Sequence, residues 1–101
     1  MSRILRGPRN EKGELHGHLE TYYSNGQLRY RCDYVNGIRH GLCEQYYIDG
    51  SLSFSGNYYN GLKDGYWEEY YSDGSLIEKG RYDKGRKVGV WLEWGREVFY
   101  T

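Results

Sequence analysis

The sequence has one proline, two cysteines and no net charge, because 14 Lys and Arg residues balance 14 Asp and Glu residues. Zero net charge argues against a general nucleic-acid binder and against attraction of the whole molecule to anionic membranes. No apolar run approaches the roughly 18 residues of a membrane span, and the first residues do not resemble a signal peptide. We therefore expect a cytoplasmic chain that binds neither nucleic acid nor membrane.

Cysteine is too scarce for a disulfide scaffold, and Cys32 and Cys43 lack the spacing of metal ligands. We expect buried, reduced thiols, and a disulfide between the two is the alternative.

Aromatic residues and glycine are abundant: the chain has 13 Tyr, 3 Trp, 2 Phe and 15 Gly among 101 residues. Disordered chains are poor in aromatic residues and carry net charge, so this composition predicts a folded chain with an aromatic core. The length allows one small domain.

A period of 24 residues runs through the sequence, and it relates Gly17, Gly41, Gly65 and Gly89. Seven further registers repeat in phase with these glycines, among them those that begin at Tyr22, Leu28 and Tyr34. Such a fixed period is typical of repeat architectures. Each unit contains two short runs rich in Tyr and apolar residues, so each unit is predicted to form two strands.

Turn signals separate these runs. The pairs Asn25-Gly26, Asp49-Gly50 and Asp73-Gly74 favour type I′ turns of two residues, and a looser connection follows from Asn36-Gly37 to Gly41 and its repeats. The expected strands lie near 17–23, 28–34, 41–47, 52–58, 65–71, 76–82 and 89–94, with a last one at 97–101. The fold class is all-β, a single elongated, twisted antiparallel meander of hairpin repeats.

The predicted organisation has two parts. Residues 1–12 form a basic N-terminal lead-in or cap, and residues 13–101 form the repeat sheet, with about three full repeats and a partial C-terminal one.

Strand alternation sorts the side chains onto two faces. One face collects the apolar and aromatic residues, where Gly56 and Gly80 leave room for the indoles of Trp67 and Trp91. The other face is polar and pairs Glu20 with Arg31, Tyr22 with Arg29, His18 with Asp33, Glu68 with Lys79, and Tyr66 with Arg81. A single-layer sheet cannot hide a large core, so the aromatic face must be covered by strong twist or curling of the sheet, by a partner or by a second copy. That face is the candidate binding surface. The candidate binding residues are Tyr47, Phe54, Tyr58, Trp67, Tyr71, Tyr82 and Trp91.

Catalytic and metal-binding patterns are weak. The recurring Glu20, Glu44 and Glu68 occur once per repeat, which favours structural pairing over an asymmetric catalytic site. His16, His18 and His40 have no adjacent cysteine or carboxylate set with metal-ligand spacing. We predict no enzyme, no metal site and no cofactor.

The stretches Gly41-Leu42-Cys43-Glu44-Gln45-Tyr46-Tyr47-Ile48-Asp49-Gly50-Ser51-Leu52 and Gly65-Tyr66-Trp67-Glu68-Glu69-Tyr70-Tyr71-Ser72-Asp73-Gly74-Ser75-Leu76 resemble the MORN repeat in its bacterial variant form. The likeness covers roughly residues 13–94. It implies an elongated sheet of successive hairpins whose Gly and aromatic positions line a groove. It also implies protein–protein interaction or assembly, with lipid binding in some members, and bacterial proteins of this type are often labelled antitoxin-like.

The predicted function is a non-catalytic protein–protein interaction module that binds a protein segment through an aromatic groove, in an antitoxin-like or inhibitory role. The partner is another protein, such as a toxin or a host factor. One alternative is a self-associating structural protein, a homo-oligomer. Another is a small-ligand binder that uses aromatic stacking.

Overall fold

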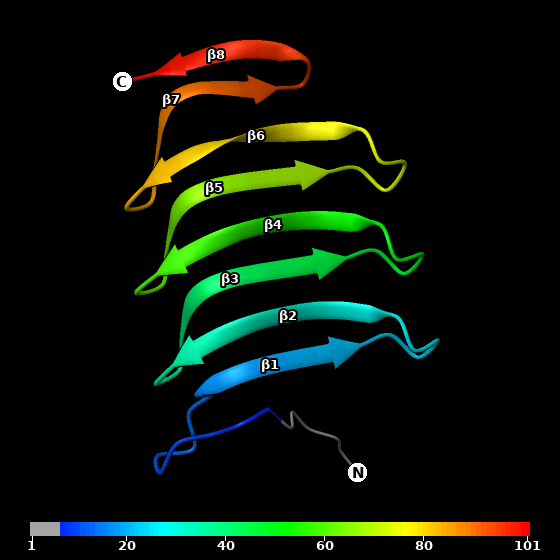
Figure 1. The fold of residues 1–101 in the computed structure, drawn as a ribbon, viewed down its shortest axis with the longest axis vertical. Helices are drawn as coiled ribbons and strands as arrows, with labels where there is room; N and C mark the ends of the chain where they lie inside the picture. Colours follow the sequence, from blue (N-terminus) through cyan, green and yellow to red (C-terminus); the bar gives the residue numbers. More distant parts are fainter. Residues whose placement is uncertain (1–6) are drawn as a thin grey trace.

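The computed structural model describes residues 7–101, which form one antiparallel sheet of eight strands in chain order (Figure 1). The strands are β1 (Gly17–Tyr22), β2 (Leu28–Val35), β3 (Ile38–Tyr46), β4 (Leu52–Tyr59), β5 (Leu62–Tyr70), β6 (Leu76–Asp83), β7 (Arg86–Glu93) and β8 (Arg96–Tyr100). The molecule measures 46 × 31 × 16 Å. The predicted all-β meander is confirmed.

The N-terminal lead-in lies partly outside the described residues, which begin at Gly7. From there the chain forms a small antiparallel bridge between Arg9 and Leu15, and the amide of His16 donates a hydrogen bond to the carbonyl of Pro8 (2.9 Å). The amide of Gly37 donates to the carbonyl of Leu15 (2.7 Å), so this segment is tied to the first tight turn.

The two kinds of turn are exchanged relative to the sequence prediction. The tight turns of two residues are Asn36-Gly37, Asn60-Gly61, Lys84-Gly85 and Trp94-Gly95, in which both residues have positive φ. Asn25-Gly26 lies instead in a three-residue loop, Ser24 to Gly26, where only the glycine has positive φ. In this loop the amide of Gly26 donates to the carbonyl of Tyr23 (3.0 Å), which is the pattern of a type I turn followed by a left-handed residue.

This exchange changes the strand limits and the register. Because the Asn36-Gly37 turn is tight, β3 begins at Ile38 and not at the predicted residue 41, and β5 and β7 begin early for the same reason. The predicted pair Leu19–Cys32 is confirmed, but a bulge at Thr21 and Tyr22 places Tyr22 opposite Leu28, so the predicted pairing of Tyr23 with Leu28 is wrong.

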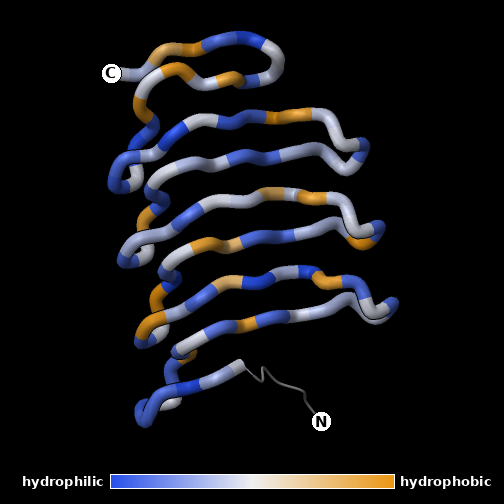
Figure 2. The backbone as a smooth tube through the Cα atoms, in the orientation of Figure 1, coloured by the Kyte–Doolittle hydropathy of each residue, from blue (hydrophilic) through white to orange (hydrophobic). Residues whose placement is uncertain are grey.

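Aromatic side chains form the core on one side of the sheet. The face that carries them is called the aromatic face, and its main residues are Tyr30, Tyr34, Phe54, Tyr58, Trp67, Tyr82 and Trp91. A Cβ atom at Gly56 would overlap the indole of Trp67, and one at Gly80 would overlap Trp91, as the sequence predicted. Figure 2 shows short hydrophobic stretches separated by hydrophilic ones, the pattern of a sheet that buries one face.

The cysteines are buried, as predicted, but they are not reduced thiols. Cys32 and Cys43 lie directly opposite each other on β2 and β3, with their Cα atoms 4.1 Å apart, and form a disulfide. Both side chains are fully buried. The expectation of free thiols is wrong because the tight turn fixes a register that the predicted looser connection left open.

Candidate functional site

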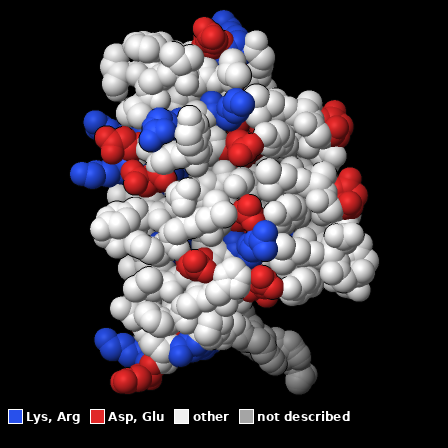
Figure 3. Space-filling model, viewed as in Figure 1, with Lys and Arg blue, Asp and Glu red and all other residues white. Residues whose placement is uncertain are grey.

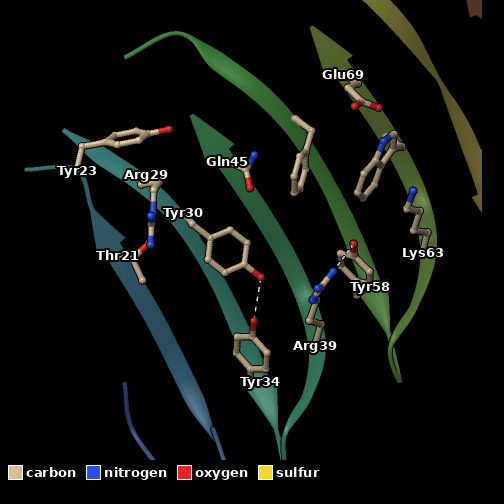
Figure 4. Close-up of a pocket in the computed structure, with 12 residues that line it drawn as sticks. Thr21, Tyr23, Arg29, Tyr30, Tyr34, Arg39, Gln45, Tyr58, Lys63 and Glu69 are labelled. Carbon is tan, nitrogen blue, oxygen red and sulfur yellow. Dashed lines mark hydrogen bonds between the residues drawn. The ribbon is translucent and has the colours of Figure 1, made fainter. Parts of the chain in front are cut away.

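A groove of about 680 Å³ crosses the aromatic face from β1 to β5 (Figure 4). We call this cavity the groove. It is lined by Thr21, Tyr23, Arg29, Tyr30, Tyr34, Arg39, Gln45, Phe54, Tyr58, Lys63, Trp67 and Glu69. Its walls combine aromatic rings with three positive side chains and one carboxylate, so it suits a ligand with both an apolar and a negatively charged part.

Three of the residues predicted from the sequence, Phe54, Tyr58 and Trp67, line the groove. Two others, Tyr82 and Trp91, extend the same row of rings beyond it: Trp67 to Tyr82 (6.0 Å between centroids) and Tyr82 to Trp91 (5.0 Å). Trp91 is fully buried and Trp67 is 4% exposed, so both indoles act mainly as core.

The other two predicted residues, Tyr47 and Tyr71, lie apart from the groove, beside the three-residue loops. The hydroxyl of Tyr47 donates a hydrogen bond to the carbonyl of Tyr70 (2.7 Å). The hydroxyl of Tyr71 accepts one from the indole nitrogen of Trp94 (3.0 Å). These contacts connect neighbouring repeats.

Sequence reasoning missed the positive side chains of the groove. The predicted pairing of Arg29 with Tyr22 on the polar face is wrong, because the bulge places Tyr22 opposite Leu28, and Arg29 lies over the ring of Tyr23 (5.9 Å) and lines the groove. Arg39, Lys63 and Lys87 share one register of the 24-residue period, and each lies over an aromatic ring. The distances to the ring centroids are 5.0 Å from Arg39 to Tyr58, 4.2 Å from Lys63 to Trp67, and 4.5 Å from Lys87 to Trp91. The 24-residue period could have revealed these three cations. The loop predicted from 36 to 41, and its repeats, obscured the register that they share.

The three cations of this register, of which Lys87 lies outside the groove, differ in how they are neutralised. Lys87 forms ion pairs with Glu78 (2.9 Å) and Glu93 (2.6 Å). Burial lowers the pKa of Lys87, but the hydrogen bonds to both glutamates outweigh that effect, so its pKa is raised. Arg39 and Lys63 form no ion pair with any carboxylate of residues 7–101; Arg39 instead donates a hydrogen bond to the Tyr58 hydroxyl (2.8 Å).

The opposite side of the sheet, called the polar face, carries His18, Glu20, Arg31, Asp33, Glu44, Tyr66, Glu68, Lys79 and Arg81. The predicted contact of His18 with Asp33 is present (2.7 Å), and so is the stacking of Arg81 on Tyr66 (5.0 Å). Arg31 lies opposite Glu20 in the register, yet its ion pair is with Glu44 on β3 (2.6 Å). In the view of Figure 3, positive and negative side chains are interspersed.

In residues 7–101 the structure contains no cluster of three or more His, Cys, Asp or Glu residues that could hold a metal ion. In the same part of the chain, no helix is present that is long and apolar enough to cross a membrane.

Comparison with known proteins identifies one family. The family described as MORN repeat variant matches residues 15–36 and 63–84, two segments that are offset by two periods of 24 residues. No curated protein matches the chain. Repeats of this family generally mediate interactions with proteins or membranes, and the family is not enzymatic. Residues 15–36 and 63–84 are therefore identified as MORN repeats of the variant type.

Proposed function

We propose that this protein is a non-catalytic interaction module whose groove accepts an extended segment of a partner protein. The observation that carries the proposal is the groove itself: an open cavity of about 680 Å³ with aromatic walls and positive side chains that have no acidic partner. Tyrosine and arginine are the residue types that dominate protein–protein interfaces, because they combine large contact area with directional hydrogen bonds.

The shape of the site favours a segment over a compact ligand. The lining residues come from five consecutive strands, β1 to β5, and neighbouring strands lie about 4.8 Å apart, so the groove extends for about 20 Å across the sheet. An extended chain of about six residues covers that length at roughly 3.3 Å per residue.

The experiment is selection of peptides from a random display library on the purified protein. Selected peptides should lose at least tenfold in affinity on the Arg39→Ala variant and keep their affinity on Arg81→Ala. These variants are matched, because each arginine stacks on a tyrosine at 5.0 Å, one on the aromatic face and one on the polar face. Selection of no peptide, or of peptides that do not distinguish the two variants, would contradict the proposal.

Light scattering on the same sample tests the self-associating alternative. A monomer that binds the selected peptides supports the interaction module. A stable dimer whose groove residues are protected from chemical labelling would instead assign the groove to a contact between two copies of the chain.

A further inference from the structure

One repeat lacks the tryptophan ring that packs over a glycine in the other two repeats. Trp67 lies over Gly56 and Trp91 lies over Gly80, whereas the first unit has Cys43 and Cys32 at the corresponding positions. Cys32 and Cys43 form a disulfide and both side chains are fully buried, so this unit has no indole at that position. The flanking rings of Tyr30 and Tyr34 face each other in the groove, with their hydroxyl oxygens 2.9 Å apart (Figure 4). These two tyrosines line the groove in this unit, whereas the two cysteines beneath them are fully buried and do not.

The same unit also lacks the acids that neutralise the equivalent cation. Lys87 is paired with Glu78 and Glu93, and a shift of 48 residues, two periods, relates these three residues to Arg39, Tyr30 and Gln45. Both carboxylates are thus replaced by uncharged side chains at Arg39. With Arg29 and Lys63 beside it and only Glu69 against it, the groove has three positive charges and one negative.

We propose that the partner segment presents an aromatic side chain flanked by carboxylates, so this inference rests on the proposed function and specifies its partner. The ring packs against Tyr30 and Tyr34, which line the groove in the unit that has a disulfide in place of an indole. The carboxylates pair with Arg39 and Lys63. Such pairs combine ionic attraction with hydrogen bonds, and the free cations are already held in place by their aromatic contacts.

The spacing of the two cations sets the spacing of the acids. Arg39 is on β3 and Lys63 is on β5, two strands apart, which corresponds to about 10 Å. In an extended peptide that crosses the strands, residues three positions apart are also separated by about 10 Å. The expected pattern is therefore two acidic residues three positions apart, with an aromatic residue between them.

The test uses labelled peptides and fluorescence anisotropy on the full chain in its oxidised state, which intact mass verifies. The probe peptide has two glutamates three positions apart with one phenylalanine between them and glycine elsewhere. One comparison peptide has lysines in place of the glutamates, and another has alanine in place of the phenylalanine. We expect the probe to bind at least tenfold more tightly than either.

Two variants test separately the contributions of the charged residues and of the aromatic ring to peptide binding. Arg39→Glu should reverse the preference between the glutamate and lysine peptides, and Arg81→Glu on the polar face is the matched control that should not. The double variant Cys32→Gly with Cys43→Trp restores the Gly–Trp pair of the other units. It should abolish the advantage of phenylalanine over alanine and keep the preference for glutamate. Circular dichroism checks the fold, and if the double variant fails to fold, the Arg39→Glu reversal decides.

The outcomes distinguish this inference from the proposed function. Display peptides that bind the groove without acids or an aromatic ring would overturn the inference and leave the interaction module in place. Equal binding of the glutamate and lysine peptides would also overturn it. Arg39-dependent binding to phosphatidylserine vesicles without binding of the probe peptide would assign the groove to a membrane surface and overturn both.

Discussion

At the scale of single residues, the fold depends on pairs in which a glycine makes room for an indole. Gly56 lies opposite Trp67, whose ring stacks on Phe54 (5.1 Å between centroids) and meets Tyr58 edge-on (5.8 Å). Such aromatic pairs contribute about 0.5–1.5 kcal/mol each beyond the area they bury. This pairing could be predicted from the sequence, because the 24-residue period places a glycine beside Trp67 and another beside Trp91.

Gly56→Ala tests this packing. The new methyl group would overlap the indole of Trp67, so we expect the free energy of unfolding to fall by about 1–3 kcal/mol, the usual cost of overpacking. Urea unfolding measures the change, with Asn57→Ala, an exposed neighbour, as the control. The same substitution in a Trp67→Leu background should cost less. An equal cost in both backgrounds would mean that the indole is not what Gly56 accommodates.

His18 provides a pH-dependent contact on the polar face. Its Nδ1 lies 2.7 Å from Asp33 and its Nε2 lies 3.0 Å from Glu20, so both nitrogens have acidic partners when the ring is protonated. The hydrogen bonds with Glu20 and Asp33 raise the pKa of His18 above its usual value of 6.5. A raised folded pKa means that the stabilisation is present below about pH 6.5 and is lost as the pH rises through the folded pKa.

We therefore expect His18→Gln to lower stability at about pH 5.5 and to have no effect at about pH 8.5. The loss should stay below about 1 kcal/mol, because the ring is half exposed and solvent screens the pair. Thermal unfolding at the two pH values measures it, and NMR titration of the imidazole should give a midpoint above 6.5. A midpoint below that value would contradict the contact.

At the scale of strands and turns, the sequence predicted the elements better than their connections. Eight strands were expected and eight are present, yet the tight turns and the longer loops exchanged places. An Asn-Gly or Asp-Gly pair suits both a type I′ turn and the end of a type I turn, so the dipeptide alone does not decide. That ambiguity also hid Arg39 and Lys63, which belong to strands only if the turns before them are tight.

The tight turns give a direct test. Lys84 has φ of 49°, a left-handed conformation that costs most residues energy and that asparagine tolerates, as at Asn36 and Asn60. Lys84→Asn should raise the free energy of unfolding by up to about 1 kcal/mol. The reverse change, Asn60→Lys, should lower it by a similar amount. Urea unfolding measures both, and a stabilising Asn60→Lys would show that turn conformation does not control these hairpins.

At the scale of the whole molecule, the sheet has one layer and stays open. Its Cα radius of gyration is 15.4 Å, whereas a compact chain of this length has about 13 Å. Small-angle scattering of the monomer should give a value near 15.4 Å plus the hydration shell. A value near that of a compact chain would mean that the sheet closes over its aromatic face in solution, which would remove the groove.

The position of the groove could not be predicted from the sequence. The sequence indicated the aromatic face and three of its lining residues, Phe54, Tyr58 and Trp67, because tyrosine and tryptophan recur with the period. Part of its lining, Tyr30, Tyr34 and Arg39, belongs to the unit that departs from the repeat pattern at Cys32 and Cys43, and the effect of that departure depends on the register across the turn.

The strand order, which is identical to the order along the chain, has a mechanical consequence. Each strand is hydrogen-bonded only to its neighbours in sequence. Tension applied to the two ends of the described sheet would therefore break the hydrogen bonds of one strand pair at a time. The strands would separate from the sheet one after another, starting at either edge. Each unit of 24 residues would release about 80 Å of chain, which would give a force trace with regular steps at the period of the sequence.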